Sequence, residues 1–518
     1  MIINRYSFCL LLALFVAALT CSCDEKTPVP EHPTAITLSA DELVFTTADA
    51  ASLPLTVTAP SQPTFSDLPD WLSVIDGTFQ DYQTTVMFNV TENTATVPRI
   101  ATVIIRSIGA PPITVNVTQY GAGFTGNGLP DNDAVKRTLE LGIGWNLGNH
   151  LDSYSARSGG GYMIPDETAW GNPRATQQTF DKLRSYGFTS VRIPVTWLGS
   201  IGPAPDYTIY AKWMARVTEV VEYAHKAGLQ VIINTHHDEN HGDDHWLNIG
   251  AAPGNVALNQ QIKEEITAVW TQIAENFKDC GDWLMFEGFN ELNDGGWGWS
   301  ADFRANPMRQ CGVLNEWQQT FVDAVRATGG NNAIRWLGIS TYAANPEYEK
   351  YLVMPTDPAG KLMLSVHCYD PSDYTIGDAQ YSDWGHTGQK GKKANWGDED
   401  HIQKVFKNLF DKYIVNNIPV YLGEYGCSMR NKSDARSWAF YLYYLEYVSK
   451  AARTYAIPAM LWDNGSKGWG KERHGYIDHG TGEFTSTSQA PVEAILKGWC
   501  TNDESYTLDT VYNSAPVF

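Results

Sequence analysis

The sequence predicts an α/β protein in which a (β/α)8 TIM barrel follows a small all-β, immunoglobulin-like sandwich. Three observations lead to this fold class. Short runs rich in β-branched residues occupy residues 34–121, eight apolar runs alternate with helical stretches from Asp133 onward, and polar side chains gather where those runs end. The length of 518 residues also favours two domains, because a single hydrophobic core of that size is uncommon.

The first 23 residues have the features of a bacterial export signal. An apolar run of about 12 residues, Phe8–Leu19, follows Arg5, and it is shorter than the roughly 20 residues that a membrane span needs. Cys23 comes after small residues and before acidic ones, which resembles the lipidation site of bacterial lipoproteins, with Cys21 as the alternative. We therefore expect a signal peptide over residues 1–23 and a lipid anchor on Cys23. The protein would then be a secreted lipoprotein of the outer membrane, at the cell surface of a Gram-negative bacterium.

The segment after the signal is expected to hold a tether and the β-sandwich. Residues 24–33 are rich in Pro, Thr and Glu and form the predicted tether. Residues 34–121 form the predicted sandwich, because turn residues separate short β-branched runs at close intervals. These runs are Leu43–Phe45, Leu53–Val57, Val86–Val90, Ala101–Ile105 and Ile113–Val117.

Trp71, Arg99 and the closing Gln119-Tyr120-Gly121 give this segment a further feature. With them it resembles the BACON domain, a module found beside bacterial polysaccharide-degrading enzymes. The resemblance implies either a spacer or a module that binds carbohydrate or mucin. We favour the spacer, because Trp71 is the only tryptophan of the segment.

Residues 122–132 are interpreted as a linker. Gly121–Gly126 matches the dinucleotide-binding pattern G-x-G-x-x-G, but Pro130 follows closely and no βαβ unit surrounds it, so we reject that interpretation. The barrel is expected over residues 133–518. Its eight predicted strands are Ile143–Asn146, Ser190–Pro194, Gln230–Thr235, Leu284–Asn290, Ile334–Ser340, Leu362–His367, Pro419–Glu424 and Pro458–Trp462.

Most of these runs are continuously apolar, as expected for parallel strands that are buried on both faces. Helical periodicity fills the intervals between them. Residues Ala211–Ala227 repeat apolar side chains on one face and end before Gly228, and Thr176–Tyr186 end before Gly187, a residue type that commonly terminates helices. Eight such units in a domain of this size predict the barrel.

The composition limits the classes of partner. A net charge of -21 disfavours nucleic acid and anionic lipid and suits a neutral substrate. Aromatic residues make up 12% of the chain, which suits sugar binding because pyranose rings stack on indoles, although large cores explain the value equally well. Three of the 8 cysteines lie in the first 23 residues, and the odd remainder predicts no disulfide framework. We expect a monomer.

Polar residues stand at the carboxyl ends of six predicted strands, where a (β/α)8 barrel places its active site. They are Arg192, His236, His237, Asp238, Asn290, Glu291, His367, Tyr369, Glu424, Trp462 and Asp463. One such residue alone is often structural. Six strand ends together favour a functional site.

Glu291 and Glu424 carry the expected chemistry. They follow the fourth and seventh predicted strands, which lie across the barrel from each other. Two facing carboxyl groups about 5–5.5 Å apart suit cleavage of a glycosidic bond with retention, one attacking the anomeric carbon and the other protonating the leaving oxygen. We assign Glu424 as the nucleophile, kept ionised by Arg192 and Tyr369. We assign Glu291 as the acid/base, with a pKa raised by the charge of Glu424.

Other side chains are predicted to bind the substrate. Asn290 is expected to bond to the sugar 2-hydroxyl, Trp462 to form the floor under the reacting ring, and His236 to line the same subsite. The full predicted set is Arg192, His236, His237, Asn290, His367, Tyr369, Trp462, Asn149, Trp297 and Trp299. The last two lie on a Gly-rich loop after Glu291 and are expected beyond the cleavage point.

Several of these positions resemble, in order, the signature of a known family: Arg192, His236, Asn290-Glu291, His367, Tyr369, Glu424 and Trp462. That family is glycoside hydrolase family five, and the match spans roughly residues 133–500. The resemblance implies a retaining glycosidase with a barrel fold, an acid/base at Glu291, a nucleophile at Glu424 and no cofactor.

Three longer phrases, Gly144–Asn149, Glu167–Pro173 and Arg192–Trp197, look like subfamily four of that family. This resemblance implies an endo-β-1,4-glucanase that acts on plant polysaccharides, as many xyloglucanases and mixed-linkage glucanases do. We prefer xyloglucan as the substrate. Linear or mixed-linkage β-glucan and β-mannan stay open as alternatives.

Two other interpretations of the sequence are less favoured. A non-catalytic surface glycan-binding protein would be expected to lack one carboxylate, but both are present. The His- and Asp-rich segment His236–His245 lacks H-E-x-x-H, and His236 and His237 are expected to point to opposite faces of a strand, so we predict no metal site. Loosely bound calcium is the weaker alternative there.

Overall fold

The computed structural model describes residues 32–40, 42–45, 48–94, 99–119, 129–155, 164–239, 245–377, 381–501, 503 and 505–518. The predicted signal peptide with Cys21 and Cys23, most of the tether and most of the linker with its Gly-rich pattern lie outside these residues. Within them, no helix combines the length and the apolar character that crossing a bilayer requires. The chain divides into two compact units, Met1–Thr94 with Arg99–Tyr120, and Ala95–Pro98 with Gly121–Phe518.

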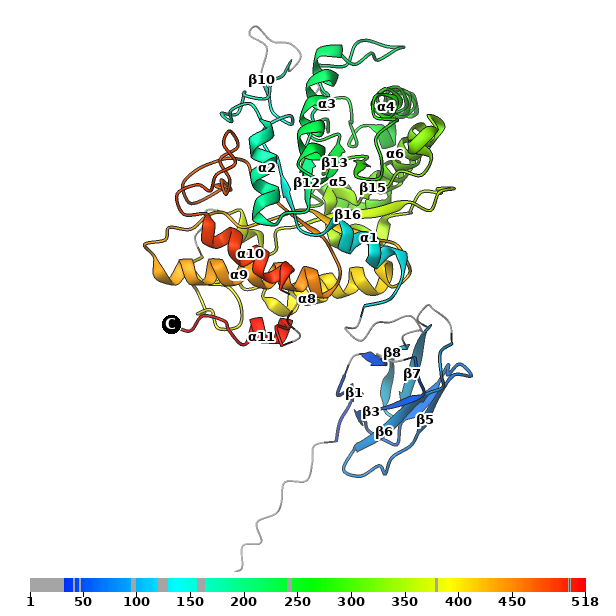
Figure 1. Ribbon diagram of the computed structural model, residues 1–518. Helices are drawn as coiled ribbons and strands as arrows, with labels where there is room; N and C mark the ends of the chain where they lie inside the picture. The colour runs from blue at the N-terminus through cyan, green and yellow to red at the C-terminus, as the bar shows by residue number, and fades with distance from the viewer. Residues whose placement is uncertain are drawn as a thin grey trace, which may run out of the picture. The chain divides into compact units, whose positions relative to one another are not determined.

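The N-terminal unit contains two four-stranded sheets (Figure 1). One sheet has the order β1-β3-β6-β5 and the other has the order β2-β8-β7-β4. The strands are β1 (Thr37–Leu38), β2 (Glu42–Phe45), β3 (Ala51–Thr58), β4 (Thr64–Ser66), β5 (Leu72–Ile75), β6 (Gln83–Val90), β7 (Arg99–Ser107) and β8 (Ala110–Gln119). All paired neighbours run antiparallel except β2 and β8, which run parallel. The prediction of an all-β module before the barrel is confirmed.

Alternating side chains build the core of this unit. Along β6, Thr84, Val86, Phe88 and Val90 are buried, and the residues between them are more exposed. Successive side chains of a strand point to opposite faces, so one face of each sheet supplies the core. The buried cluster comprises Ile36, Leu43, Phe45, Leu55, Val57, Ala59, Leu72, Val86, Phe88, Val90, Ala101, Val103, Ile105, Val115 and Val117.

Three residues on which the BACON resemblance rests lie together. The Arg99 guanidinium lies over the Trp71 ring, 4.6 Å from its centroid, and its Nε donates to the Gln119 side chain at 2.9 Å. The Gln119 amide in turn donates to the backbone carbonyls of Ala48, Asp49 and Thr91. This network joins the end of β8 to two loops.

The second unit contains a closed parallel barrel with the order β12-β13-β14-β15-β16-β17-β18-β9. The strands are β9 (Gly144–Asn146), β12 (Ser190–Ile193), β13 (Gln230–Asn234), β14 (Leu284–Glu287), β15 (Leu337–Ser340), β16 (Leu362–Cys368), β17 (Val420–Tyr425) and β18 (Ala459–Leu461). A hairpin of β10 (Tyr154–Ser155) and β11 (Ile164–Pro165) stands apart from the barrel sheet. Each predicted barrel strand overlaps one observed strand, so the predicted TIM barrel is confirmed.

Helices surround the barrel strands (Figure 1). The α-helices are α1 (Asp133–Leu141), α2 (Gln177–Tyr186), α3 (Ala211–Lys226), α4 (Val256–Asn276), α5 (Ala301–Ala305), α6 (Pro307–Ala327), α7 (Ser372–Thr375), α8 (Glu399–Leu409), α9 (Ala435–Thr454), α10 (Gln489–Cys500) and α11 (Leu508–Tyr512). Short 3-10 or π turns are η1 (Ala252–Gly254), η2 (Gly330–Ala333), η3 (Tyr342–Ala344), η4 (Pro346–Tyr351) and η5 (Phe410–Ile414). The predicted stop at Gly187 is confirmed, because this residue caps α2 with a left-handed φ of 115°.

Two strand boundaries differ from the sequence-based expectation by three residues, whereas the other barrel-strand boundaries agree to within one residue. The fourth strand ends at Glu287 instead of Asn290, and the backbone then turns toward the mouth of the barrel. The fifth strand begins at Leu337 instead of Ile334, because Ile334 follows the η2 turn and is 63% exposed. An apolar run alone therefore does not predict the residue at which a strand begins or ends.

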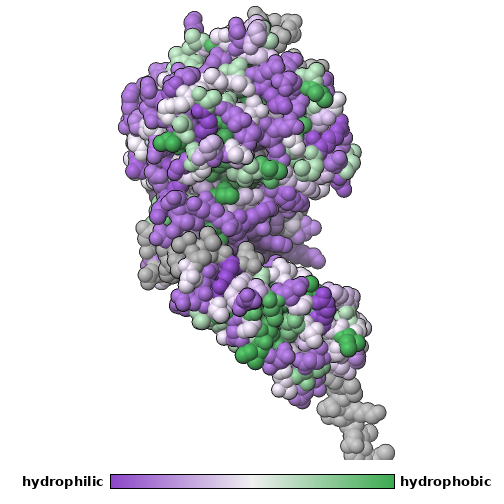
Figure 2. All heavy atoms as spheres, turned by 90° about the vertical axis from the view of Figure 1, so that its right-hand side faces the viewer, coloured by the Kyte–Doolittle hydropathy of each residue, from purple (hydrophilic) through white to green (hydrophobic). Residues whose placement is uncertain are grey.

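A second apolar cluster lies inside the barrel and consists of Leu141, Ile232, Met285, Trp336, Met363, Tyr421 and Met460. The surface differs from this interior. On the face drawn in Figure 2, hydrophilic residues prevail over the barrel unit, whereas hydrophobic residues gather in a patch on the N-terminal unit. The apolar core and the parallel register leave the carboxyl ends of the strands as the place where polar side chains meet.

Candidate active site

Arg192, in β12, is the centre of a buried network at the carboxyl end of the barrel. Its guanidinium donates to both oxygens of Glu287, at 3.0 and 2.7 Å, and to Oε1 of Glu424 at 2.8 Å. It also donates to the amide oxygens of Asn146 at 3.1 Å and Asn290 at 2.8 Å. The side chain is fully buried, so these partners replace water around its charge.

Glu424 is held on two sides. Besides Arg192, the Tyr369 hydroxyl donates to its Oε2 at 2.9 Å. Ring nitrogens of His236 and His367 lie 3.9 and 3.6 Å from its oxygens. These contacts fix the orientation of the carboxylate.

Glu291 lies on the loop after β14 and faces Glu424. Its Oε1 lies 2.7 Å from Nδ1 of His367. One oxygen of Glu291, one oxygen of Glu424 and a ring nitrogen of His367 all lie within 4.8 Å of one another. The two predicted acids therefore meet, although 133 positions separate them in the chain (424 minus 291).

The two carboxyl groups have different electrostatic surroundings. Burial raises the pKa of Glu291 to about 8, and the nearby Glu239 carboxylate acts in the same direction. Burial also raises the pKa of Glu424, but His367, Arg192 and the Tyr369 hydroxyl counteract it. Only Glu424 has a cation and a hydroxyl bonded directly to it, so it is the acid that ionises more readily.

His367 is suited to serve either protonation state of Glu291. Burial lowers the pKa of His367 to about 4, so its ring is neutral near pH 7. A neutral imidazole donates from Nδ1 to an ionised carboxylate and accepts there from a protonated one. On the other side, a β-carbon at Gly423 would lie 2.8 Å from Nε2, which explains the glycine at this point of β17.

Irregular strand pairing accompanies this site. The register between β16 and β17 shifts between Val366 and His367, and the register between β17 and β18 shifts between Leu422 and Tyr425. Such shifts re-aim side chains next to functional sites. Here they flank His367 and Glu424.

A series of rings leads away from the acids. Trp462 lies parallel to His236, with a centroid distance of 5.9 Å and an angle of 5°. His236 contacts His237, His237 contacts Trp170, and Trp170 contacts Tyr154. The predicted roles of Trp462 as the floor under the reacting ring and of His236 as a lining of the same subsite stay predictions, and sequence reasoning did not assign Trp170 to the site.

His237 differs from His236 in its charge. Although burial opposes protonation, the Glu239 and Asp152 carboxylates, each 3.7 Å from its ring, raise the pKa of His237 to about 9. Burial lowers the pKa of His236 well below its ordinary value. The pair thus joins one charged ring and one neutral ring.

The expectation that His236 and His237 point to opposite faces is wrong. Donor atoms of Asp152, His236 and His237 lie within 4.8 Å of one another. The reason is that β13 ends at Asn234, so strand alternation no longer applies at the two histidines. The rings are instead engaged with carboxylates and with each other.

Asn149, Trp297 and Trp299 lie on loops of the same barrel end. Asn149 has a left-handed φ of 56° and donates its backbone N–H to Asp152. Trp297 is 47% exposed and Trp299 is 76% exposed. The backbone N–H of Trp297 donates to the side-chain oxygen of Asn293. Their predicted contact with substrate stays a prediction.

Glu287 is a residue of the site that sequence reasoning missed. It is fully buried in β14, where it accepts from Arg192, from the Tyr421 hydroxyl at 2.8 Å and from the Asn234 amide at 3.3 Å. One signal was available, because a charged residue stands inside an otherwise apolar run. Glu287 and Glu424 thus both accept hydrogen bonds from Arg192, and together they balance its positive charge.

A facing pair of carboxyl groups at the carboxyl end of a (β/α)8 barrel is the arrangement with which glycoside hydrolases cleave glycosidic bonds. The family model for cellulase (glycosyl hydrolase family 5) matches residues 156–468. The chain belongs to that family.

Known relatives agree with this membership. Endoglucanase A of Paenibacillus barcinonensis is 35% identical over 381 residues, which cover 70% of this chain and 90% of the relative. A xyloglucan-specific endo-β-1,4-glucanase of Bacteroides ovatus is 32% identical over 433 residues, covering 80% of this chain and 81% of the relative. A broad specificity endoglucanase from Bacteroides salanitronis, described as GH5-4, has a solved structure and is 48% identical. The match has a TM-score of 0.66 and covers 71% of this chain and 94% of the endoglucanase chain.

We predict that Glu287→Gln destabilises the barrel by about 3 kcal/mol, because it removes one of the two carboxylates that compensate a buried guanidinium. Thermal unfolding and the urea midpoint measure the change. Tyr421→Phe is the matched control, since it removes one hydrogen bond to the same carboxylate and should cost only about 1–2 kcal/mol. Equal stability of Glu287→Gln and the wild type would contradict the central place of this pair.

Proposed function

We propose that this enzyme is a retaining endo-β-1,4-glucanase of subfamily four, with Glu424 as the nucleophile and Glu291 as the acid/base. One observation carries the proposal. Oxygens of Glu291 and Glu424 lie within 4.8 Å of each other. The Glu424 carboxylate is bonded to Arg192 and Tyr369, whereas the Glu291 carboxyl group is bonded to the neutral ring of His367. Retaining glycosidases hold their carboxyl groups about 5–5.5 Å apart, whereas inverting ones need roughly 6.5–9.5 Å.

In the first step, a Glu424 oxygen forms a bond to the anomeric carbon while the bond from that carbon to the leaving oxygen breaks. The proton of Glu291 passes to the leaving oxygen. The products are a glycosyl ester on Glu424 and a free sugar hydroxyl. In the second step, water gives a proton to Glu291 and its oxygen forms a bond to the anomeric carbon, while the bond between that carbon and the Glu424 oxygen breaks. Glu424 is thereby released as a carboxylate and Glu291 is protonated again.

The charge of Glu424 couples the two steps. Burial and the Glu239 carboxylate raise the pKa of Glu291, which therefore holds a proton. Two carboxyl groups this close also disfavour each other's charge, so an ionised Glu424 favours the protonated form of Glu291. Formation of the ester removes that charge, so the pKa of Glu291 falls and the same group serves as a base. His367 stays bonded to Glu291 in both states by exchanging donor and acceptor roles.

Neighbouring groups are suited to bind the reacting sugar. The amide oxygen of Asn290 accepts from Arg192, which leaves its NH2 group to donate to the sugar 2-hydroxyl. That bond strengthens as positive charge develops at the anomeric carbon. Trp462, parallel to His236, offers an aromatic face to the sugar ring.

For the substrate, we propose β-1,4-glucan backbones of plant polysaccharides, with xyloglucan preferred. The relative from Bacteroides ovatus is named as specific for xyloglucan, and the Bacteroides salanitronis neighbour is described as having broad specificity. Initial rates of reducing-end release from xyloglucan, lichenan, carboxymethylcellulose and β-mannan discriminate the candidates. The highest kcat/KM on xyloglucan supports the preference. Release from lichenan or carboxymethylcellulose alone would reassign the enzyme to unbranched glucans, and release from mannan alone would overturn the glucanase assignment.

For the location, we propose a lipoprotein that the anchor on Cys23 holds at the outer membrane, with the N-terminal unit as a BACON-type spacer. The support is the sequence pattern around Cys23 and the position of the all-β unit before the barrel. Cys23→Ser should move the protein from the membrane fraction to the soluble fraction. An unchanged distribution of the protein between the two fractions would contradict the lipid anchor. Retardation of the isolated N-terminal unit on glucan gels would contradict the spacer role.

We predict that Glu291→Ala and Glu424→Ala each lower kcat on polysaccharide by about 10³-fold or more, without loss of the folded barrel. The two variants should differ with an aryl β-cellobioside whose leaving group needs no proton. Glu291→Ala should then form the glycosyl ester rapidly and show a burst of released phenol. Glu424→Ala should show no burst. Equal loss of the burst in both variants would contradict the assigned roles, and circular dichroism serves as the folding control.

We predict a bell-shaped pH dependence of kcat/KM on polysaccharide. Glu291 must be protonated in the first step, and its pKa is about 8, so activity should fall as the pH rises through about 8. Glu424 must be ionised, so activity should also fall in acid, at a pH above the ordinary range of a glutamate. With the activated aryl glycoside the alkaline limb should weaken or vanish. An alkaline limb that persists in Glu291→Ala would show that another group produces it.

A further inference from the structure

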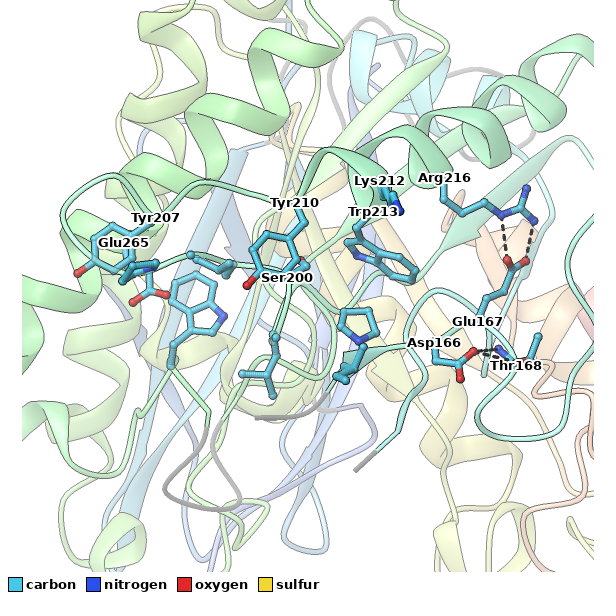
Figure 3. Close-up of a pocket in the computed structure, with 18 of the residues that line it drawn as sticks. Asp166, Glu167, Thr168, Ser200, Tyr207, Tyr210, Lys212, Trp213, Arg216 and Glu265 are labelled. Atoms are coloured by element: carbon cyan, nitrogen blue, oxygen red, sulfur yellow. Dashed lines mark hydrogen bonds and ion pairs between the residues drawn. The ribbon is translucent and has the colours of Figure 1, made fainter. Parts of the chain in front are cut away.

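A large cavity lies outside the paired acids, at the carboxyl end of the barrel (Figure 3). It has a volume of about 1010 Å³ and is formed mainly by the loop after β12, by β11 and the segment that follows it, and by parts of α3 and α4. Its wall includes Leu198, Tyr207, Tyr210, Trp213, Trp246 and Glu265. Neither Glu291 nor Glu424 belongs to that wall.

Two indoles of the wall are fixed in place. The Trp213 N–H donates to the carbonyl of Thr196 at 3.1 Å, and the Trp246 N–H donates to Asp238 at 2.8 Å. With their polar atoms engaged inside the protein, these rings offer apolar surface to the cavity. They need little ordering when a ligand arrives.

Two tyrosines complete the aromatic lining. Tyr207 is buried and has a left-handed φ of 43°, a conformation that costs energy for a residue other than glycine. Tyr210 is 58% exposed and belongs to the same wall, so its ring is accessible to a ligand. In Figure 3, Tyr210 and Trp213 lie along the middle of the cavity and Tyr207 lies at one end.

Glu265 supplies a polar group that the protein leaves unused. It reaches the cavity from α4 beside Tyr207, and it is only 9% exposed (Figure 3). No hydrogen bond or ion pair joins it to any residue of the described ranges. Burial raises the pKa of its carboxyl group to about 7, so the group both donates and accepts near neutral pH. The carboxyl group lines the cavity, so a hydroxyl group of a ligand can become its hydrogen-bond partner.

The charge at the other end of the cavity is already compensated. Glu167 forms an ion pair with Arg216 at 2.7 Å and accepts from the N–H of Ala175 at 2.7 Å. The wall holds three basic residues, Arg174, Lys212 and Arg216, and three acidic ones, Asp166, Glu167 and Glu265, so its balanced charge suits a neutral ligand. A purely apolar ligand would leave Glu265 unpaired. A neutral ring compound with apolar faces and hydroxyl groups at its edge fits both features.

We propose that this cavity is an ancillary binding site for pyranose rings of a β-glucan, separate from the catalytic acids. The aromatic rings contact the faces of the sugar, and Glu265 bonds to one of its hydroxyl groups. The identity of the polymer rests on the proposed function, but binding here requires no catalysis. Because the same loops belong to the carboxyl end of the barrel, a bound polymer raises the local concentration of cleavable chain.

The test measures binding and turnover separately on the full-length protein. Binding to xyloglucan and to lichenan is measured by affinity electrophoresis in the Glu424→Ala background, where no polymer is consumed. Tyr210→Ala should weaken the apparent Kd about fivefold, and Tyr210→Phe, which keeps the ring, should stay within about twofold of the parent. Glu265→Leu should also weaken binding while it preserves or raises the Tm, because it removes an unpaired buried carboxyl group.

Turnover supplies the second readout. In the otherwise wild-type enzyme, Tyr210→Ala should lower kcat/KM on the polymer and leave kcat/KM on an aryl cellobioside unchanged, because a disaccharide does not fill the cavity. Unchanged polymer binding in both Tyr210→Ala and Glu265→Leu would overturn the inference, even if the parent hydrolyses glucan. Weaker binding to xyloglucan only would mean that the site contacts the xylose branches. An absence of hydrolysis by the parent would instead count against the proposed function.

Discussion

The buried charge of Arg192 is the interaction on which the site depends. A guanidinium without water is stable only when anions and dipoles surround it, and here β9, β14, β17 and the loop after β14 each supply one. The same contacts set the orientation of Glu424 and Asn290. Folding and site geometry are therefore linked, because closing the barrel brings the partners of Arg192 together.

The difference between the two acids follows from their neighbours and not from their type. Both are glutamates in a cleft that disfavours charge. A cation and a phenol bond to Glu424, whereas a neutral imidazole bonds to Glu291. Two identical side chains thus acquire pKa values suited to different tasks, which is how glycosidases commonly separate a nucleophile from an acid. The pKa of Glu265, which burial raises to about 7, shows that burial near this barrel end acts well beyond the pair.

Much of the fold and the main acids could be predicted, because both depend on local pattern. Apolar runs marked every barrel strand, and Glu291 and Glu424 followed two of them. Prediction failed where chain geometry departs from that pattern. The strand before His236 ends at Asn234, one residue earlier than predicted, so the two histidines share a face of the site. Glu287 was overlooked, because it lies inside an apolar run and its partner Arg192 is 95 positions away.

The order of strands and helices, the polar strand ends and the family signature were determined by the sequence alone. Burial periodicity is a property of neighbouring residues, so it can be read without coordinates. The tertiary structure decided which polar atoms meet. It brings Glu291, His367 and Glu424 within 4.8 Å of one another and bonds Arg192 to Glu424, although 232 positions separate these two in the chain. It also places Glu265 in the wall of an aromatic cavity. Such distances arise only when the barrel closes, since closure sets separations that no local pattern encodes.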